Sequence, residues 1–91
     1  MGKKYVEEFR KILKRLKAES NRERYNALGN LSRNEDEERI WQLCRKFWQD
    51  EQSQREGNGE YAINENLDEA MAQKYIKELT ALLNKLGWAK E

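Results

Sequence analysis

The sequence predicts an all-α fold, and three features of its apolar and helix-breaking residues lead to this prediction. In three segments the apolar residues recur at i, i+3, i+4 and i+7, which places them on one face of a helix. The chain contains no proline, and its five glycines all lie outside these apolar stripes. Because the three amphipathic helices can bury their stripes against one another, we predict a three-helix bundle that forms one domain over residues 1–91.

The first helix is predicted over residues 3–19. At about 100° per residue its apolar and basic side chains fall on opposite faces, so this segment is expected to be a basic amphipathic helix. The apolar stripe consists of Tyr5, Val6, Phe9, Ile12, Leu13 and Leu16. The cations are Lys3, Lys4, Arg10, Lys11, Lys14, Arg15 and Lys17.

A polar connector over residues 20–34 follows this helix. The sequence leaves open whether residues 21–28 form a short fourth helix, which is the main variant of the three-helix bundle. Gly29 would end such a helix, because glycine is frequent directly after a helix C-terminus.

The second helix is predicted over residues 35–54. Asn34 with Glu37, or Ser32 with Glu35, matches the capping box that satisfies unpaired amides at a helix start. The first turn then holds four consecutive carboxylates, which the positive end of the helix dipole favours. The apolar face consists of Ile40, Trp41, Leu43, Cys44, Phe47 and Trp48.

The third helix is predicted over residues 67–86. A glycine-containing break precedes it, and the apolar residues alternate briefly at the end of this break, which allows a short extended stretch. Asn66 with Glu69 is expected to form its capping box. Gly87 is expected to end the helix in a left-handed conformation, with Trp88 packing back onto Leu83.

Charge is distributed unevenly along the chain, although the net charge is only +1. Residues 1–33 hold ten Lys or Arg and four Asp or Glu, whereas residues 34–70 hold four and eleven. A basic first third therefore precedes an acidic middle, and this asymmetry matters for the choice of partner.

Residues that support catalysis or metal binding are scarce. The chain has no histidine, which removes the commonest general base and the commonest transition-metal ligand. Cys44, the single cysteine, lies on an apolar stripe, where burial would raise the pKa of its thiol and keep it unreactive. We therefore expect no enzymatic activity, no metal and no cofactor.

The location of the protein is predicted from two further absences in the sequence. No apolar run approaches the ~18 residues that span a bilayer, and the N-terminus lacks the apolar region of a signal peptide. We expect a cytoplasmic protein without a membrane span.

The basic half of the first predicted helix is the main candidate for binding. We expect it to follow a nucleic-acid backbone or to dock on an acidic protein. The protein's own acidic residues 35–38 are one such acidic surface. A nucleic acid would also meet Arg22, Arg24 and Arg33 of the connector and would be held through its phosphates, without base readout. Lying on a membrane is disfavoured because the core needs the apolar half of this helix. A helix face that only keeps the protein soluble remains the alternative without a function.

The tryptophans indicate a second hypothesis, in which the protein is a helical interaction or regulatory protein such as an inhibitor or adaptor. Trp41, Trp48 and Trp88 would then anchor a protein partner or a second copy of the chain in a homodimer. Tryptophans at helical spacing are more often core residues, so burial is the competing interpretation.

Overall fold

The computed structural model of the chain describes residues 3–29, 34–49 and 63–90. Within these ranges the regular elements are helical, apart from one isolated β-bridge. In chain order they are α1 (Lys4–Leu16), the 3-10 turn η1 (Glu19–Asn21), α2 (Arg22–Ala27), α3 (Glu35–Phe47) and α5 (Glu69–Lys85). The all-α prediction is confirmed, and α2 is the short additional helix that the sequence left open.

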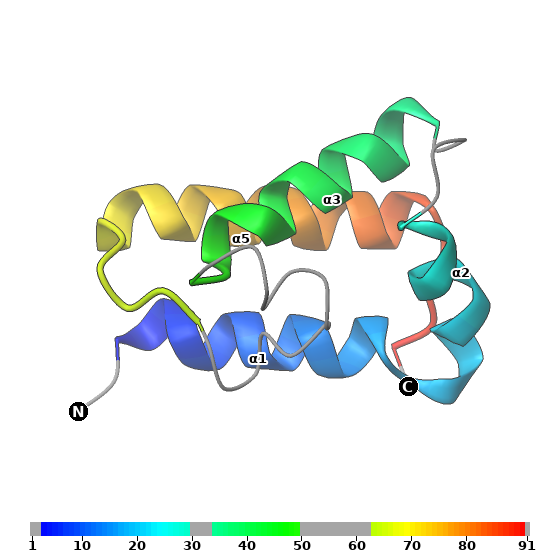
Figure 1. Cartoon of the computed structure of the whole chain (residues 1–91), viewed down its shortest axis with the longest axis horizontal. Helices are drawn as coiled ribbons and strands as arrows, with labels where there is room; N and C mark the ends of the chain where they lie inside the picture. Colours follow the sequence, from blue (N-terminus) through cyan, green and yellow to red (C-terminus); the bar gives the residue numbers. More distant parts are fainter. Residues whose placement is uncertain (1–2, 30–33, 50–62, 91) are drawn as a thin grey trace.

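Helix α5 lies beside both α1 and α3. Helices α1 and α5 point in the same direction and α3 in the opposite direction (Figure 1). At one end, Lys3 Nζ donates to the carbonyl of Leu67, 3.2 Å away, directly before α5. At the opposite end of the molecule, Asp36 in the first turn of α3 pairs with Lys85 in the last turn of α5, with an N···O distance of 3.2 Å. The first contact joins the start of α1 to the start of α5, as expected for parallel helices. The second joins the start of α3 to the end of α5, as expected for antiparallel helices.

The buried apolar side chains form one cluster to which α1, α3 and α5 all contribute. Tyr5, Phe9 and Phe47 are completely covered. The rings of Phe9 and Phe47 stack with centroids 4.4 Å apart, and Tyr75 meets Phe47 edge-on at 6.1 Å. Such ring pairs contribute about 0.5–1.5 kcal/mol beyond the area they bury. The core therefore uses the whole apolar stripe of α1.

The predicted helix over residues 35–54 was wrong at its C-terminal end, because α3 ends at Phe47. Trp48 is extended (φ −84°, ψ 142°) and forms an antiparallel bridge with Ile63, which lies in the region where the sequence allows a short extended stretch. The amide of Asn64 donates to the carbonyl of Phe47 at 2.7 Å, which gives that carbonyl a partner outside the helix. This pairing overrides the local helical pattern, and residues 50–54 lie outside the described part of the chain.

The helix starts were predicted correctly for α3 and incorrectly for α5. Asn34 Oδ1 accepts the amide of Glu37 at 2.8 Å, and Glu37 Oε1 accepts the amide of Asn34 at 2.9 Å, which is the expected capping box. The other candidate, Ser32, lies outside the described residues. In α5 the cap is Asp68, whose carboxylate accepts the amide of Met71 at 3.0 Å. Asn66 lies two residues before this cap, in a turn in which its amide donates to Asn64 Oδ1.

The predicted stop after α5 is confirmed. Gly87 has φ +74°, and its amide donates to the carbonyl of Asn84 at 3.2 Å. The amide of Trp88 donates to the carbonyl of Leu83 at 2.9 Å, which completes a Schellman motif. The chain therefore turns back, and Trp88 is only 4% exposed.

The segment after α5 is held against α1 and the connector by three polar side chains. Asn21 is 2% exposed and both donates to and accepts from the backbone of Ala89, at 2.7 and 3.0 Å. Arg15 donates to the carbonyl of Trp88 at 2.8 Å, and Arg24 donates to that of Leu86 at 2.8 Å. We call Arg15, Asn21 and Arg24 the C-terminal clasp.

The two described glycines that follow helices provide a matched test of the stop after α5. Gly87→Ala is expected to lower the free energy of unfolding by about 1 kcal/mol, because an L side chain is strained at positive φ even where space is open. Gly29→Ala is the control, since φ is not positive there and the added Cβ would lie 3.6 Å from the Asn26 carbonyl oxygen. Urea unfolding measures both, and equal destabilisation of the two variants would contradict the assigned stop.

Candidate anion-binding surface

The outward half of α1 carries most of the cations that the sequence singled out. This half of α1 must face solvent because the opposite half of the helix is buried in the core. The exposed cations of this half are Lys3, Lys4, Arg10, Lys11, Lys14 and Lys17, and we call them the basic face.

Four members of the basic face have no polar partner within the described part of the chain. The side chains of Lys4, Arg10, Lys11 and Lys14 make no hydrogen bond or ion pair with another described residue. Lys3 differs because it donates to the Leu67 carbonyl, and Lys17 also has a partner. The centre of the basic face therefore carries charge that the described structure does not neutralise.

The prediction from sequence overlooked one carboxylate on this side of the helix. Glu7 is exposed and lies four residues before Lys11 and three before Arg10, so its carboxylate faces the same solvent. The helical spacing could have revealed it. Glu7 lowers the net positive charge near the start of α1 and leaves the stretch from Arg10 to Lys17 as the most basic part.

Arg15 and Arg24, both expected among the binding residues, lie in the C-terminal clasp instead. Arg15 donates to Asn84 Oδ1 at 3.0 Å as well as to the Trp88 carbonyl. Arg24 donates to the Leu86 carbonyl and lies over the Trp88 ring, 5.8 Å from its centroid. Arg22 is exposed, whereas Arg33 lies outside the described residues. Arg15 and Arg24 are thus both bonded to the segment at the end of α5, although Arg24 also remains exposed.

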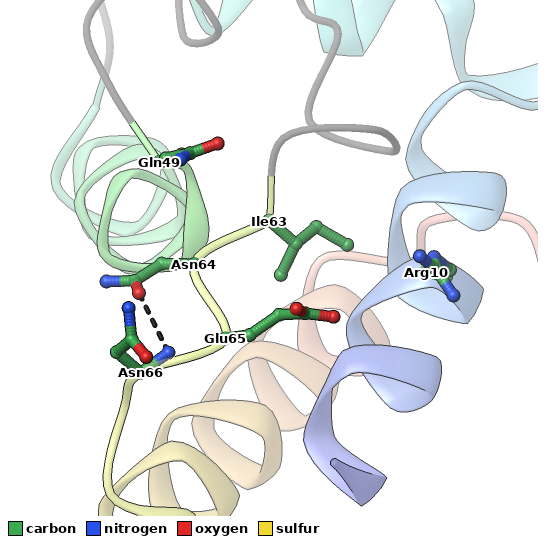
Figure 2. A pocket seen from close by; sticks show the side chains of 6 residues that line it. All are labelled: Arg10, Gln49, Ile63, Asn64, Glu65 and Asn66. Carbon is green, nitrogen blue, oxygen red and sulfur yellow. Dashed lines mark hydrogen bonds between the residues drawn. The ribbon is translucent and has the colours of Figure 1, made fainter. Parts of the chain in front are cut away.

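Arg10 lines two hollows on the surface of the protein. The first, of about 220 Å³, follows the outer surface of α1, and we call it the basic groove. It is lined by Arg10, Lys11, Leu13, Lys14 and Lys17. The second, of about 280 Å³, lies between α1 and the segment that precedes α5, and we call it the amide hollow. It is lined by Arg10, Gln49, Ile63, Asn64, Glu65 and Asn66 (Figure 2).

The cations on α3 are engaged within the protein, unlike those at the centre of the basic face. Arg39 forms a two-bonded ion pair with Glu78, with N···O distances of 2.6 and 2.9 Å. Hydrogen bonding to Arg39 holds the pKa of Glu78 below its ordinary value. Lys46 lies over the ring of Tyr75 at 5.1 Å, and Arg45 also has a partner. Arg39 and Lys46 therefore stabilise the packing of α3 on α5.

The acidic first turn of α3 does not neutralise the basic face. Asp36 pairs with Lys85, and Glu37 belongs to the capping box. No ion pair joins Glu35, Asp36 or Glu37 to the described cations of α1. These three carboxylates therefore do not neutralise the basic face within the described part of the chain.

The three tryptophans differ in how much surface they leave for a partner. Trp48 and Trp88 are 3% and 4% exposed and belong to the core. Trp41 is partly buried, and its ring meets that of Trp48 edge-on at 5.5 Å. A protein partner anchored on tryptophan would therefore have Trp41 as its main contact.

Comparison with models of protein families, with curated proteins and with solved structures finds no match for this chain. Among the described helices, none has the length and apolar character needed to cross a bilayer. The described residues also contain no cluster of Cys, Asp and Glu that could hold a metal ion.

Cys44 lies in the core, where burial raises the pKa of its thiol to about 12. The folded protein is therefore expected to react negligibly with a thiol-specific disulfide reagent at pH 8, because only the thiolate attacks. In denaturant the reaction should become complete, at one thiol per chain. Rapid reaction of the native protein would contradict the buried position of Cys44.

Alkaline pH is expected to destabilise the fold through one buried and one partly buried group, Cys44 and Tyr25. Burial raises the pKa values of both Cys44 and Tyr25 to about 12, so the unfolded chain loses these protons first as pH rises. Their contribution to stability is present below about pH 9 and is lost between about pH 9 and 12. The urea midpoint should fall over this range, and Tyr25→Phe should reduce the fall.

Proposed function

We propose that the protein is a small non-catalytic binding module, a bundle of three long helices crossed at one end by α2, whose basic face recognises an anionic macromolecule. The partner is a nucleic-acid backbone or an acidic protein surface. The proposal is supported mainly by the four cations at the centre of the basic face, which are exposed and lack polar partners among the described residues.

Electrostatic repulsion within the basic face favours binding over a purely solubilising role. Lys14 lies four residues after Arg10 and three after Lys11, and each like-charge pair at this spacing destabilises a helix by roughly 0.2–0.5 kcal/mol. An anion in the basic groove would relieve this repulsion. The α3 cations do not offer the same gain, because Arg39 and Lys46 already have partners.

A membrane surface is a poorer partner for α1. A helix that lies in a bilayer interface inserts its apolar half among the lipids. In this protein that half is covered by α3 and α5, and Phe9 and Leu16 are completely buried. The basic face would meet lipid headgroups by charge alone.

Charge reversal in the basic groove tests the proposal. The variant Lys11→Glu with Lys14→Glu is compared with Lys74→Glu with Lys77→Glu on the outer side of α5, and each pair lowers the net charge from +1 to −3. The ligands are a labelled single-stranded oligonucleotide and a labelled polyglutamate peptide, titrated by fluorescence anisotropy at several salt concentrations. Circular dichroism checks that both variants keep their helices.

The basic-groove variant is expected to lose roughly tenfold or more in affinity for whichever ligand binds, while the α5 variant changes much less. The affinity of the parent protein should fall steeply with salt, because binding releases counterions. Equal losses in the two variants would show that net charge alone governs binding and would contradict a site on α1. Failure of both ligands to bind the parent protein at low salt would also contradict the proposal.

A further inference from the structure

The amide hollow differs in chemistry from the basic groove that it adjoins. Three amide side chains line it, those of Gln49, Asn64 and Asn66, together with the carboxylate of Glu65 and the apolar Ile63. Figure 2 shows Arg10 on α1 at one side of the hollow, with Asn64 and Asn66 at the other side. Arg10 also lines the basic groove, so the two hollows share this one residue.

The amides of the hollow retain hydrogen-bonding capacity. The side chains of Gln49 and Asn66 are exposed and form no hydrogen bond with another described residue. Asn64 uses its Oδ1 to accept the amide of Asn66 at 2.9 Å, which leaves its Nδ2 group available to donate. Each side-chain amide can both donate and accept, with an NH₂ group beside a carbonyl oxygen.

The side-chain amides and Glu65 of the amide hollow favour a nucleic acid over an acidic protein as the partner. A nucleobase edge carries donors and acceptors side by side, and asparagine and glutamine bind such edges with paired hydrogen bonds. An acidic peptide offers carboxylates, which only accept hydrogen bonds and would be repelled by Glu65. The sequence alone had indicated phosphate contacts without base readout, because nothing in it brings residues 49 and 63–66 beside Arg10.

We infer that the partner of the basic face is a single-stranded nucleic acid. Its phosphates lie along the basic groove, and one unstacked base enters the amide hollow, where the amides hydrogen-bond its edge. A single strand is required because a base paired within a duplex cannot leave the stack without breaking its pairing. The inference rests on the proposed function and adds the class of the partner.

The inference is tested on the full chain with three labelled ligands of equal charge: a strand of about ten nucleotides, an abasic strand of the same length, and a polyglutamate peptide. The abasic strand keeps the phosphates and lacks the bases. The strand with bases is expected to bind roughly tenfold more tightly than either of the others.

Two amide variants locate the effect of the bases. Gln49→Ala with Asn66→Ala is expected to lower the affinity for the normal strand to that for the abasic strand, with an unchanged salt slope. Gln42→Ala is the matched control, because Gln42 is an exposed amide on α3 beside Arg39, Arg45 and Lys46 and outside the amide hollow.

The possible outcomes separate this inference from the proposed function. If all three ligands bind equally and Lys11→Glu with Lys14→Glu removes binding, the inference fails and the proposed function stands. Tighter binding of a duplex than of the single strand would also overturn the inference. Loss of the base effect in Gln42→Ala, with Gln49→Ala and Asn66→Ala unaffected, would overturn the placement of the base. If no ligand binds the basic face, both proposals fail.

Discussion

The burial of one half of α1 is the constraint on which the rest of the structure depends. Tyr5, Phe9 and Leu16 lose all contact with solvent, and full burial of a large apolar side chain contributes about 1.5–3 kcal/mol. With only two other long helices described, the core has no substitute for this stripe. Because a helix is rigid about its own axis, fixing the apolar half inward fixes the basic half outward.

The same packing creates an electrostatic problem that the C-terminal clasp offsets. Since α1 and α5 point in the same direction, their C-terminal ends lie at the same end of the molecule (Figure 1), and each carries the partial negative charge of a helix C-terminus. Arg15 and Arg24 donate to the carbonyls of Trp88 and Leu86 at this end. Cations near helix C-termini are stabilising, so two arginines of the basic first third serve the parallel alignment.

Features that depend on local periodicity could be predicted from the sequence, whereas features that depend on distant pairing could not. The phase of α1, the capping box at Asn34 and the stop at Gly87 follow from residues within a turn or two. The end of α3 at Phe47 depends on Ile63 and Asn64, which approach only in the folded chain. For the same reason the sequence does not reveal that Arg15 donates to Asn84 in the last turn of α5 and to Trp88 after it.

The two parts of the candidate site differ in the same way in whether they could be predicted from the sequence. The basic face comes from one helix, so spacing along the sequence was enough to find it, although Glu7 was overlooked. The amide hollow is assembled from α1, the residue after Trp48 and the segment before α5, and no local pattern predicts it. This is the physical reason why the sequence predicts the basic helix and gives no sign of the amide hollow.

The most direct test of the account is hydrogen exchange of the backbone amides, because it reports whether α1 is part of the core. If burial of its apolar half holds the fold together, the central amides of α1 should exchange as slowly as those of α3 and α5, through global unfolding. Exchange of α1 through local opening, while α3 and α5 remain protected, would contradict the account. The apolar half of α1 would then be available to a partner, and the outward direction of the basic face would no longer be fixed.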